Sequence, residues 1–358
     1  MSLHFHPLKI KEVKKETVDC VSILFDIPDN LKEQFVYTQG QNVTIKSTIN
    51  GEEVRRSYSL CSSPLQNEFR IAVKKVDGGL FSTYANDNLR AGDELELMPP
   101  IGKFYVDLNP TNKKNYVGFA AGSGITPLLS IIKTTLLTEP NSSFTLVYGN
   151  RNSQSIIFKE ELNAIKNKFL TRFQLIHILS REKMDADINT GRIDAFKCNK
   201  LFDSILSINA DEFFVCGPEE MIFSVKNFLE DRFVDPKKIH FELFTPTKKK
   251  HPNTSVQYTV NDNSPKSSIT VKLDGRSFDF DLPFNGQNIL DAALQQGADM
   301  PYACKGGVCC TCKAKLIEGE VDMEVSWGLE HEEIEQGFIL TCQAHPKTER
   351  VVVDFDVK

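Results

Sequence analysis

The clearest chemical signal in the chain is a set of four cysteines near its C-terminal end: Cys304, Cys309, Cys312 and Cys342. Three of them lie within a nine-residue loop, and the fourth follows 30 positions after the third. Four thiolates can hold two iron ions bridged by sulfide, and such a cluster passes one electron at a time. Zinc is the alternative metal, but zinc sites usually pair two short hairpins with two ligands each. Gly306 and Gly307 free the loop backbone to wrap around a cluster, which favours iron and sulfide.

The spacing C-x4-C-x2-C with a distant fourth cysteine resembles that of plant-type ferredoxins, which bind a 2Fe–2S cluster. Cys310 is a fifth cysteine inside the loop. We expect it to be a small filler or a weak S–H donor, with replacement of a ligand as the minor alternative. Two strand-like runs, Ser268–Leu273 and Ser277–Leu282, and a helix, Ile289–Gln296, precede the loop. The resemblance implies that residues 268–358 form an α+β domain of the β-grasp type.

A source for the electrons must lie upstream, where residues 1–108 contain short runs rich in β-branched and aromatic residues. Turn signals such as Asn50-Gly51 and Asp77-Gly78-Gly79 separate these runs, which predicts a small antiparallel β-barrel. The expected strands are Val18–Ile27, Gln41–Thr48, Arg56–Cys61, Phe69–Val76 and Asp93–Met98.

From about residue 113 to residue 245, apolar strands alternate with helical segments, which predicts an α/β doubly wound parallel sheet. The expected strands are Tyr116–Ala121, Phe144–Tyr148, Phe173–Leu179 and Glu212–Cys216, and the expected helices are Pro127–Leu137 and Ile157–Phe169. The following stretch is rich in Lys, Pro, Asn and Ser, which cannot bury enough apolar area to fold alone. The predicted division is therefore 1–108 for the barrel domain, 109–245 for the α/β domain, 246–267 for a linker and 268–358 for the cysteine-rich domain.

The run Arg56-Ser57-Tyr58-Ser59 matches R-x-Y-S, the flavin signature of the ferredoxin–NADP reductase superfamily, and the resemblance implies an FAD site. Arg56 can pair its planar guanidinium with a pyrophosphate, and the Tyr58 ring can stack on the flavin ring system. Ser59 can offer a hydrogen bond near the flavin N5 atom, where hydride arrives. FMN is the alternative flavin.

The run from Gly78 to Thr83 resembles the second phosphate-binding loop of the superfamily. Its glycines and hydroxyl residues at an expected helix start can present N–H donors to the pyrophosphate. The resemblance implies FAD contacts from this loop and from the Val-Lys-Lys-Val run just before it. The implied contacts are Val73, Lys75, Gly79, Phe81, Ser82 and Thr83.

The run G-x-G-I-T-P follows an expected strand and opens a helix, so it can hold a diphosphate at the helix N-terminus. The resemblance to the superfamily implies that this run forms a pyridine-nucleotide site, made of Gly122, Gly124, Thr126 and Pro127. It also implies that nicotinamide meets flavin at a second run, made of Cys216, Gly217 and Pro218. Ser180 and Arg181 resemble the pair that NADP-specific members use for the 2′-phosphate, which predicts NADPH over NADH. Glu242 and Phe244 resemble the superfamily's E-x-F ending, whose aromatic residue covers the flavin.

The order of the three domains covers the whole chain and resembles the reductase components of multicomponent oxygenases. Local details resemble the branch that serves phenylacetyl-CoA epoxidase in phenylacetate degradation: His6-Pro7-Leu8, Glu53–Ser59, Val73–Val76, Met98–Gly102 and Tyr148–Arg151. The resemblance implies electron flow from NADPH through FAD and 2Fe–2S to a di-iron oxygenase, with Ser59 and Cys216 as catalytic residues. The alternatives are a reductase for a ring-hydroxylating dioxygenase or another hydroxylase, and a redox-sensing or scaffold module with zinc.

Composition limits the partners. Of 358 residues, 41% are hydrophobic and 25% charged, and the net charge of −6 argues against nucleic acid. No apolar run reaches the roughly 18–20 residues that span a bilayer, and the N-terminus lacks a signal pattern, so we expect no membrane and a cytoplasmic location. Residues 268–358 carry a net charge of −8, leaving +2 on the rest, which predicts an acidic docking face for a redox partner.

Overall fold

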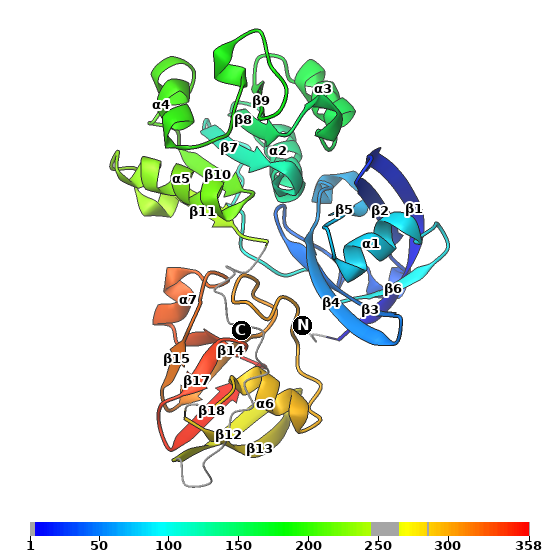
Figure 1. The fold of residues 1–358 in the computed structure, drawn as a ribbon, viewed down its shortest axis with the longest axis vertical. Coiled ribbons are helices and arrows are strands. Elements are labelled where there is room, and N and C mark those ends of the chain that lie inside the picture. Colours follow the sequence, from blue (N-terminus) through cyan, green and yellow to red (C-terminus); the bar gives the residue numbers. More distant parts are fainter. Residues whose placement is uncertain (1–3, 245–264, 285, 358) are drawn as a thin grey trace. The chain divides into compact units, whose positions relative to one another are not determined.

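The computed structural model describes residues 4–244, 265–284 and 286–357 (Figure 1). The chain divides into two compact units, and the first, His4–Phe244, holds the barrel and the α/β domain. The second unit contains the cysteine loop. Among the described residues, no helix combines the length and apolar character needed to cross a membrane.

The first domain is an antiparallel sheet of six strands in the order β4-β3-β6-β1-β2-β5. The strands are β1 (His6–Thr17), β2 (Cys20–Asp26), β3 (Asn42–Ile49), β4 (Glu52–Ser59), β5 (Phe69–Lys74) and β6 (Glu94–Leu97). A bridge between Leu60 and Ile71 joins the two ends of the sheet, so the sheet closes into a barrel around an aliphatic and aromatic core. Helix α1 (Leu80–Asp87) follows β5 and packs against the barrel. The predicted antiparallel barrel is confirmed.

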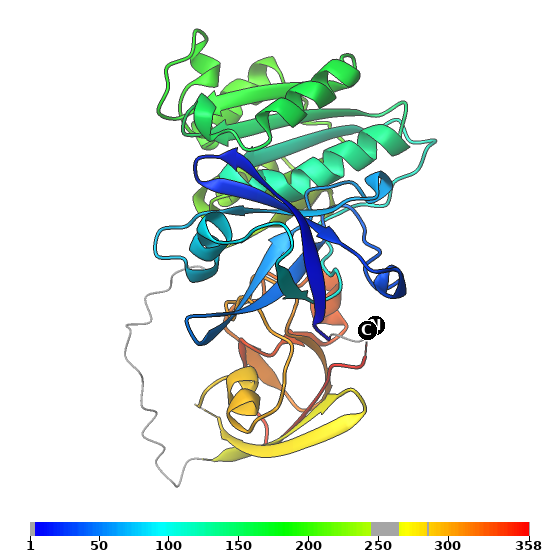
Figure 2. The same ribbon diagram turned by 90° about the vertical axis from the view of Figure 1, so that its right-hand side faces the viewer.

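The second domain is a parallel sheet of five strands in the order β11-β10-β7-β8-β9. The strands are β7 (Asn115–Ala121), β8 (Ser143–Asn150), β9 (Phe173–Leu179), β10 (Glu212–Cys216) and β11 (Ile239–Glu242). The helices are α2 (Ile125–Thr138), α3 (Lys159–Lys168), α4 (Ala195–Ser204) and α5 (Glu219–Glu230). Figures 1 and 2 show the sheet between two helix layers, with α2 and α3 on one face and α4 and α5 on the other. The predicted doubly wound sheet is confirmed.

Buried hydroxyl groups join the barrel to the α/β domain. Ser130 of α2 donates to the Ser62 carbonyl at 2.6 Å, and the Ser63 and Thr134 hydroxyls lie 2.9 Å apart. All four residues are at most 3% exposed. Because these hydrogen bonds are made away from water, separating the two domains would break them at a cost in free energy, so they help to hold the two domains together as one unit.

The second unit has a mixed sheet in the order β13-β12-β18-β14-β16, with β12 and β18 parallel and the other pairs antiparallel. Its strands are β12 (Lys266–Leu273), β13 (Arg276–Pro283), β14 (Lys313–Glu318), β15 (Val321–Met323), β16 (Phe338–Leu340), β17 (Ala344–Pro346) and β18 (Arg350–Asp354). Its helices are α6 (Ile289–Gln295) and α7 (His331–Glu335). Ile289, Leu290 and Ala293 of α6 are fully buried in the core that the sheet also lines, as expected for a β-grasp fold.

The strands and helices expected from the sequence all form, with shifted ends. Strand β4 begins at Glu52 rather than Arg56, and the 12-residue strand β1 was not predicted. Most of the predicted linker, 246–267, lies outside the described residues, although Lys266 and Ser267 already belong to β12. The domain boundaries stay a prediction.

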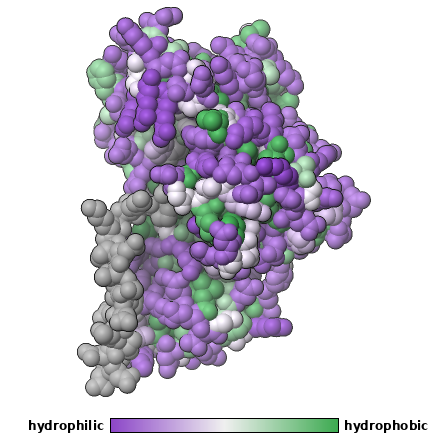
Figure 3. Space-filling view, turned by 45° about the vertical axis from the view of Figure 1, so that its right-hand side comes forward, coloured by the Kyte–Doolittle hydropathy of each residue, from purple (hydrophilic) through white to green (hydrophobic). Residues whose placement is uncertain are grey.

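On the face shown in Figure 3, hydrophilic side chains dominate and hydrophobic ones are scattered, as is usual for protein surfaces. Large apolar side chains that are more than half exposed include Val18, Leu170, Phe196 and Phe233.

Candidate functional site

The cysteines of the loop lie as two pairs. Cys304 Sγ and Cys309 Sγ are 3.1 Å apart, and the thiols of Cys312 and Cys342 hydrogen-bond to each other. A two-iron cluster needs two thiolates on each iron, whereas one zinc ion needs its donors around a single point. The arrangement of the four cysteines as two pairs therefore fits a 2Fe–2S cluster better than a single zinc ion.

Backbone amides of the loop point at the sulfurs. The Gly306 N–H donates to Cys304 Sγ at 3.3 Å, and the Gly307 N–H donates to the sulfur of Cys342. Gly307 has a φ of +71°, in the left-handed region that favours glycine. Such N–H groups stabilise negative charge on thiolates, so these two glycines explain how the loop wraps a cluster.

The cysteine pairs also bias the protonation of the sulfurs. The hydrogen bond with Cys304 lowers the pKa of Cys309 to about 6, and the hydrogen bond with Cys312 lowers the pKa of Cys342. Each pair therefore contains one sulfur that favours the thiolate, which is the form that binds iron. Cys310 lies half-buried in the same loop, and its role as a filler stays a prediction.

Strand β4 displays the predicted flavin residues on its two faces. Alternation along the strand places Arg56 and Tyr58 on one face and Ser57 and Ser59 on the other. The Arg56 side chain is exposed, and the Tyr58 ring centroid lies 5.5 Å from that of Phe81, which is buried. A guanidinium and an aromatic ring on the same face fit the pyrophosphate and ring system of a flavin dinucleotide.

The turn before α1 fits a phosphate group through its backbone. Gly78 has a φ of +69°, and a Cβ on Gly79 would lie 2.4 Å from Ser82 Oγ. The Ser82 hydroxyl accepts from the Val76 N–H at 3.1 Å and donates to the Gly79 carbonyl at 3.2 Å, so it holds the turn closed. The Thr83 N–H bonds back to the Gly79 carbonyl at 3.0 Å. The N–H groups of the first turn of α1 are therefore the donors that an anion could use.

The two predicted contacts in and just after β5, Val73 and Lys75, are buried or paired elsewhere. Val73 is fully buried in the barrel core, so only its backbone can reach a cofactor. Lys75 forms an ion pair with Asp87 at 2.6 Å. The Nζ of its neighbour Lys74 lies 3.7 Å from Asp19 Oδ2 and also 3.8 Å from the position of a Cβ on Gly122, in the α/β domain. Nothing in the residue pattern distinguishes which of the two adjacent lysines faces the glycine turn.

Three predicted residues from distant parts of the chain meet where the barrel joins the α/β domain. The Ser59 hydroxyl, at the end of β4, donates to Glu242 Oε2 at 3.1 Å. Glu242 ends β11 and lies opposite Cys216 in the register of the parallel sheet. Cys216 is fully buried, and burial raises the pKa of its thiol well above the ordinary value, with a further contribution from Glu242. The cluster therefore presents a hydroxyl, a carboxyl group and a neutral thiol.

The carboxyl ends of β7 and β10 approach each other too closely for side chains. A Cβ on Gly124 would lie 2.0 Å from the Cys216 carbonyl oxygen, and a Cβ on Gly217 would lie 3.1 Å from the Ala121 nitrogen. Only glycine fits at Gly124 without a backbone shift. This contact joins the two predicted glycine motifs at the edge of the sheet where α/β proteins bind their ligands.

The start of α2 is fixed by its own hydrogen bonds. Gly122 has a φ of +54°, and its carbonyl accepts from the Tyr148 hydroxyl at 3.0 Å. Thr126 donates to the Ser123 carbonyl at 3.0 Å, and Pro127 fills an early helical position where no N–H partner is needed. The N-terminus of α2 therefore faces the glycine edge, as a diphosphate site requires.

The expected 2′-phosphate site lies at the ends of β8 and β9. The Ser180 N–H donates to the Asn150 carbonyl at 2.9 Å, and the Arg181 N–H donates to the Arg151 carbonyl at 2.8 Å. The two strand ends therefore run side by side, with an arginine on each.

A third arginine lies beside these two strand ends. The Gly191 N–H bonds to the Leu179 carbonyl at 2.8 Å, which places Arg192 beside the end of β9. Arg151, Arg181 and Arg192 are exposed, and no described carboxylate pairs with any of the three. Arg192 lies in no recognised motif, and Arg151 was noted only as the last residue of the Tyr148–Arg151 run, so neither was predicted as a site residue.

Two further predicted residues lie near the ends of elements. Pro218 precedes α5 directly, after the Cys216–Gly217 turn. Phe244 is two residues beyond the end of β11 and 38% exposed. An exposed aromatic ring at this point is available to cover a flavin, and that role stays a prediction.

We expect the buried thiol of Cys216 to stay neutral in solution. Because its pKa is raised above the ordinary value of 9.0, it should not titrate between pH 6 and pH 9. The rate of flavin reduction by NADPH, measured by anaerobic stopped-flow, should therefore show the same pH profile for wild type and Cys216→Ser, even if the absolute rates differ. A step in the wild-type profile that the serine variant lacks would contradict this assignment. As a second measure, iodoacetamide should leave Cys216 unmodified in the native protein.

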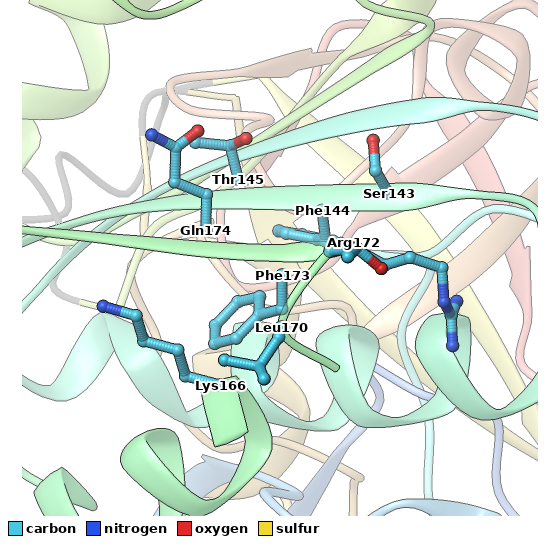
Figure 4. Close-up of a pocket in the computed structure, with 9 residues that line it drawn as sticks. Ser143, Phe144, Thr145, Lys166, Leu170, Arg172, Phe173 and Gln174 are labelled. Atoms are coloured by element: carbon cyan, nitrogen blue, oxygen red, sulfur yellow. The ribbon is translucent and has the colours of Figure 1, made fainter. Parts of the chain in front are cut away.

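A surface hollow of about 370 Å³ lies at the opposite, amino-terminal edge of the sheet. It is lined by Ser143, Phe144, Thr145, Lys166, Leu170, Thr171, Arg172, Phe173 and Gln174. Figure 4 shows these side chains around the starts of β8 and β9, with Lys166 projecting from α3. Arg172 is committed to the carbonyls of Leu136, Glu139 and Ser142. Ligands of α/β sheets bind at the carboxyl ends of the strands, so this hollow is not the nucleotide site.

Family models match each part of the chain. Residues 7–105 match the oxidoreductase FAD-binding domain, 119–227 the oxidoreductase NAD-binding domain and 271–347 the 2Fe-2S iron-sulfur cluster binding domain. These matches confirm the predicted FAD and 2Fe–2S cofactors over the FMN and zinc alternatives.

Curated relatives match over nearly the whole length. The chain is 46% identical to a subunit of 1,2-phenylacetyl-CoA epoxidase of Escherichia coli (strain K12), over 99% of this chain and 98% of that protein. It is 34% identical to the ferredoxin reductase component of 3-ketosteroid-9-alpha-monooxygenase of Rhodococcus rhodochrous, over 97% of this chain and 96% of that protein. Among solved structures, phthalate dioxygenase reductase aligns with a TM-score of 0.60 and 26% identity, covering 98% of both chains.

Proposed function

Because this chain belongs to the oxygenase reductases of the ferredoxin–NADP reductase superfamily, we propose that it carries electrons from NADPH to a di-iron oxygenase. The protein is an oxidoreductase with FAD-binding, NAD-binding and 2Fe-2S domains. When bound, FAD accepts hydride from the pyridine nucleotide and the cluster passes the electrons on singly. The partner in this proposal is the oxygenase that forms the epoxide of phenylacetyl-CoA, and the support is the 46% identity to one component of that epoxidase.

The chain's own residues position the reacting groups. Arg56 and the first turn of α1 would hold the flavin pyrophosphate, and Tyr58 would stack on its ring system. The α2 N-terminus and the Gly122–Gly124 turn would hold the nucleotide diphosphate, and Lys74 would supply positive charge there. The observation that carries the proposal is the meeting of Ser59, Glu242 and Cys216 at one point, because it brings the ends of the two cofactor-binding domains together.

Within this cluster, Glu242 accepts a hydrogen bond from Ser59 and so fixes the direction of the hydroxyl. The neutral thiol of Cys216 gives a compact wall without charge, against which a nicotinamide ring can lie. Close packing of Gly124 on the Cys216 carbonyl holds this wall at the glycine turn. These residues therefore orient the two rings and exclude water, which is the protein's share of hydride transfer.

Reconstitution tests the proposal. Purified protein loaded with FAD and cluster is mixed with a phenylacetyl-CoA oxygenase, NADPH and oxygen, and loss of phenylacetyl-CoA is followed. We expect turnover that depends on all components. Parallel reactions with a 3-ketosteroid monooxygenase and a ring-hydroxylating dioxygenase should give much lower rates. Preferred reduction of either of these oxygenases would replace the proposed partner, and the reductase assignment would stand.

Three exposed arginines at the ends of β8 and β9, Arg151, Arg181 and Arg192, support NADPH as the electron donor. Replacing Arg181 with alanine removes a charge-assisted hydrogen bond to the 2′-phosphate, which is worth about 1.5–3 kcal/mol or about 10–150-fold in KM for NADPH. The KM for NADH should change by less than about threefold, because NADH lacks that phosphate. Steady-state ferricyanide reduction with each nucleotide measures both values.

The matched control is Lys166→Ala, which removes a positive charge from the same domain at the opposite edge of the sheet. It should leave both KM values unchanged. A wild-type preference for NADH, or equal effects of Arg181→Ala on the two nucleotides, would show that Ser180 and Arg181 do not read the 2′-phosphate.

The proposal also includes the arrangement and location predicted from the sequence. Each of the three family matches lies within one proposed domain: 1–108, 109–245 or 268–358. The proposed linker, 246–267, lies between the second match and the third. A cytoplasmic location agrees with a reductase that uses NADPH and delivers electrons to another protein.

A further inference from the structure

The four cysteines differ in how close they lie to solvent. Cys304 and Cys309 are partly exposed, whereas Cys312 and Cys342 are at most 3% exposed. Electrons leave a protein-bound cluster through the side that a partner can approach most closely. That side of the cysteine loop is therefore the one formed by Cys304 and Cys309.

A short segment, 325–329, crosses this side of the loop. The Gly328 N–H donates to the Gly307 carbonyl at 2.8 Å, and a Cβ on Gly328 would lie 2.6 Å from the Cys309 carbonyl oxygen. Leu329, next in sequence, is 8% exposed and anchors the segment in the core. The segment thus lies directly on the backbone of Cys309.

Trp327 precedes Gly328 in this segment and is 42% exposed. It is the only tryptophan of the chain. A large aromatic side chain half out in water, one residue from the closest contact with a cluster ligand, is costly to leave in solvent and suited to a protein interface. Tryptophan is also the residue type most enriched among side chains that dominate binding energy.

Acidic residues follow this segment directly in the sequence, on the short helix α7 (His331–Glu335). Glu330, Glu332 and Glu335 are exposed on α7 and at its N-cap, and Ile334 between them is 38% exposed. Glu333 differs, because it is buried and pairs with Lys313 at 2.7 Å. The exposed carboxylates carry a share of the net charge of −8 on residues 268–358. Segment 325–329 and α7 therefore combine two exposed apolar side chains with three exposed carboxylates.

We propose that Trp327 and Ile334, together with Glu330, Glu332 and Glu335, form the docking surface for the oxygenase. This inference rests on the proposed function. The partner surface is an apolar pocket for the indole, bordered by lysine or arginine side chains. Complementary charge steers the encounter and sets its salt dependence, while the buried indole supplies most of the affinity. Docking here places the oxygenase against the Cys309 side of the cluster.

The test uses the full chain loaded with FAD and cluster, and the purified oxygenase that it reduces. Trp327→Ala should weaken oxygenase binding, measured by calorimetry, by about 30-fold, the effect typical of removing a dominant interface side chain. Trp327→Phe should recover much of the loss. The control Ile317→Ala removes another exposed apolar side chain of the same domain and should bind as wild type does. Glu332→Gln with Glu335→Gln should lower the on-rate at low salt and flatten its salt dependence.

Three outcomes separate the possibilities. If wild type binds and reduces the oxygenase while Trp327→Ala binds within twofold of it, the docking surface is wrong and the proposed function stands. If the variant binds normally but reduces its own cluster more slowly after NADPH is added, this surface serves the chain's flavin domain instead. If wild type neither binds nor reduces any oxygenase, both proposals fall. Absorption spectra of the cluster in each variant check that the domain is intact.

Discussion

Replacing Cys309 with serine is expected to cut electron delivery to the oxygenase by at least about 100-fold, the upper end of what losing a contact that merely supports a metal ligand costs. Cys309 pairs with Cys304 at 3.1 Å, so the change removes one of two thiolates from one iron. Reduction of ferricyanide by NADPH should stay within about twofold of wild type, because the flavin reacts with this dye directly. The two activities are measured on the same preparation, together with FAD content and acid-labile sulfide.

Cys310→Ser is the matched control, since Cys310 is in the same loop and also partly exposed. It should keep both the cluster and oxygenase reduction. Loss of the cluster in Cys310→Ser but not in Cys309→Ser would exchange the roles of the two residues. A joint fall of both activities in Cys309→Ser, with FAD retained, would contradict the separation of flavin and cluster into independent domains.

Gly124→Ala is expected to slow flavin reduction by NADPH by about 100-fold, as a displacement of about 1 Å near a reacting centre can do. The added Cβ would lie 2.0 Å from the Cys216 carbonyl oxygen and 2.8 Å from the Gly217 nitrogen, so the ends of β7 and β10 must separate. FAD should remain bound, because the barrel residues that face it are untouched. Anaerobic stopped-flow absorbance of the flavin gives the rate, and the FAD content of the purified variant gives the control.

Gly92→Ala separates this effect from simple glycine loss. Gly92 has a φ of +98°, but nothing lies within 4 Å of a Cβ there, so the cost is backbone strain of about 1–2 kcal/mol without a steric clash. The Gly92 variant should reduce its flavin at nearly the wild-type rate. Similar rates for Gly124→Ala and wild type would mean that nicotinamide reacts somewhere other than the Gly124–Cys216 contact.

The sequence predicted those parts of the fold whose hydrophobic pattern is strong. The apolar runs of β7, β8 and β10 could be recognised because both faces of a parallel sheet are covered. Strand β1 was missed because Lys9, Lys11, Lys14 and Lys15 interrupt it and only Leu8, Ile10 and Thr17 are buried. Its pairing with β2 and β6 stabilises a strand that its own composition does not indicate.

The motifs predicted which residues share a site more reliably than which atoms face a ligand. Ser59, Cys216 and Glu242 could be expected together from a family pattern, but the hydrogen bond between Ser59 and Glu242 required the fold. Ser82 illustrates the limit, because its hydroxyl turns inward to close the Gly79 turn. Local spacing fixes backbone turns, whereas the direction of a side chain depends on neighbours brought from elsewhere in the chain.

The hydrogen bonds of Ser62 and Ser63 with Ser130 and Thr134 of α2 have a consequence for engineering. Cutting the chain after the barrel would break the Ser130–Ser62 and Ser63–Thr134 hydrogen bonds and expose an apolar strip along α2. The smallest part of the chain that can be moved intact into another protein is therefore the barrel and the α/β domain together. A chimera that keeps this pair whole and exchanges only residues beyond it would inherit the nucleotide preference of one parent and the oxygenase of the other.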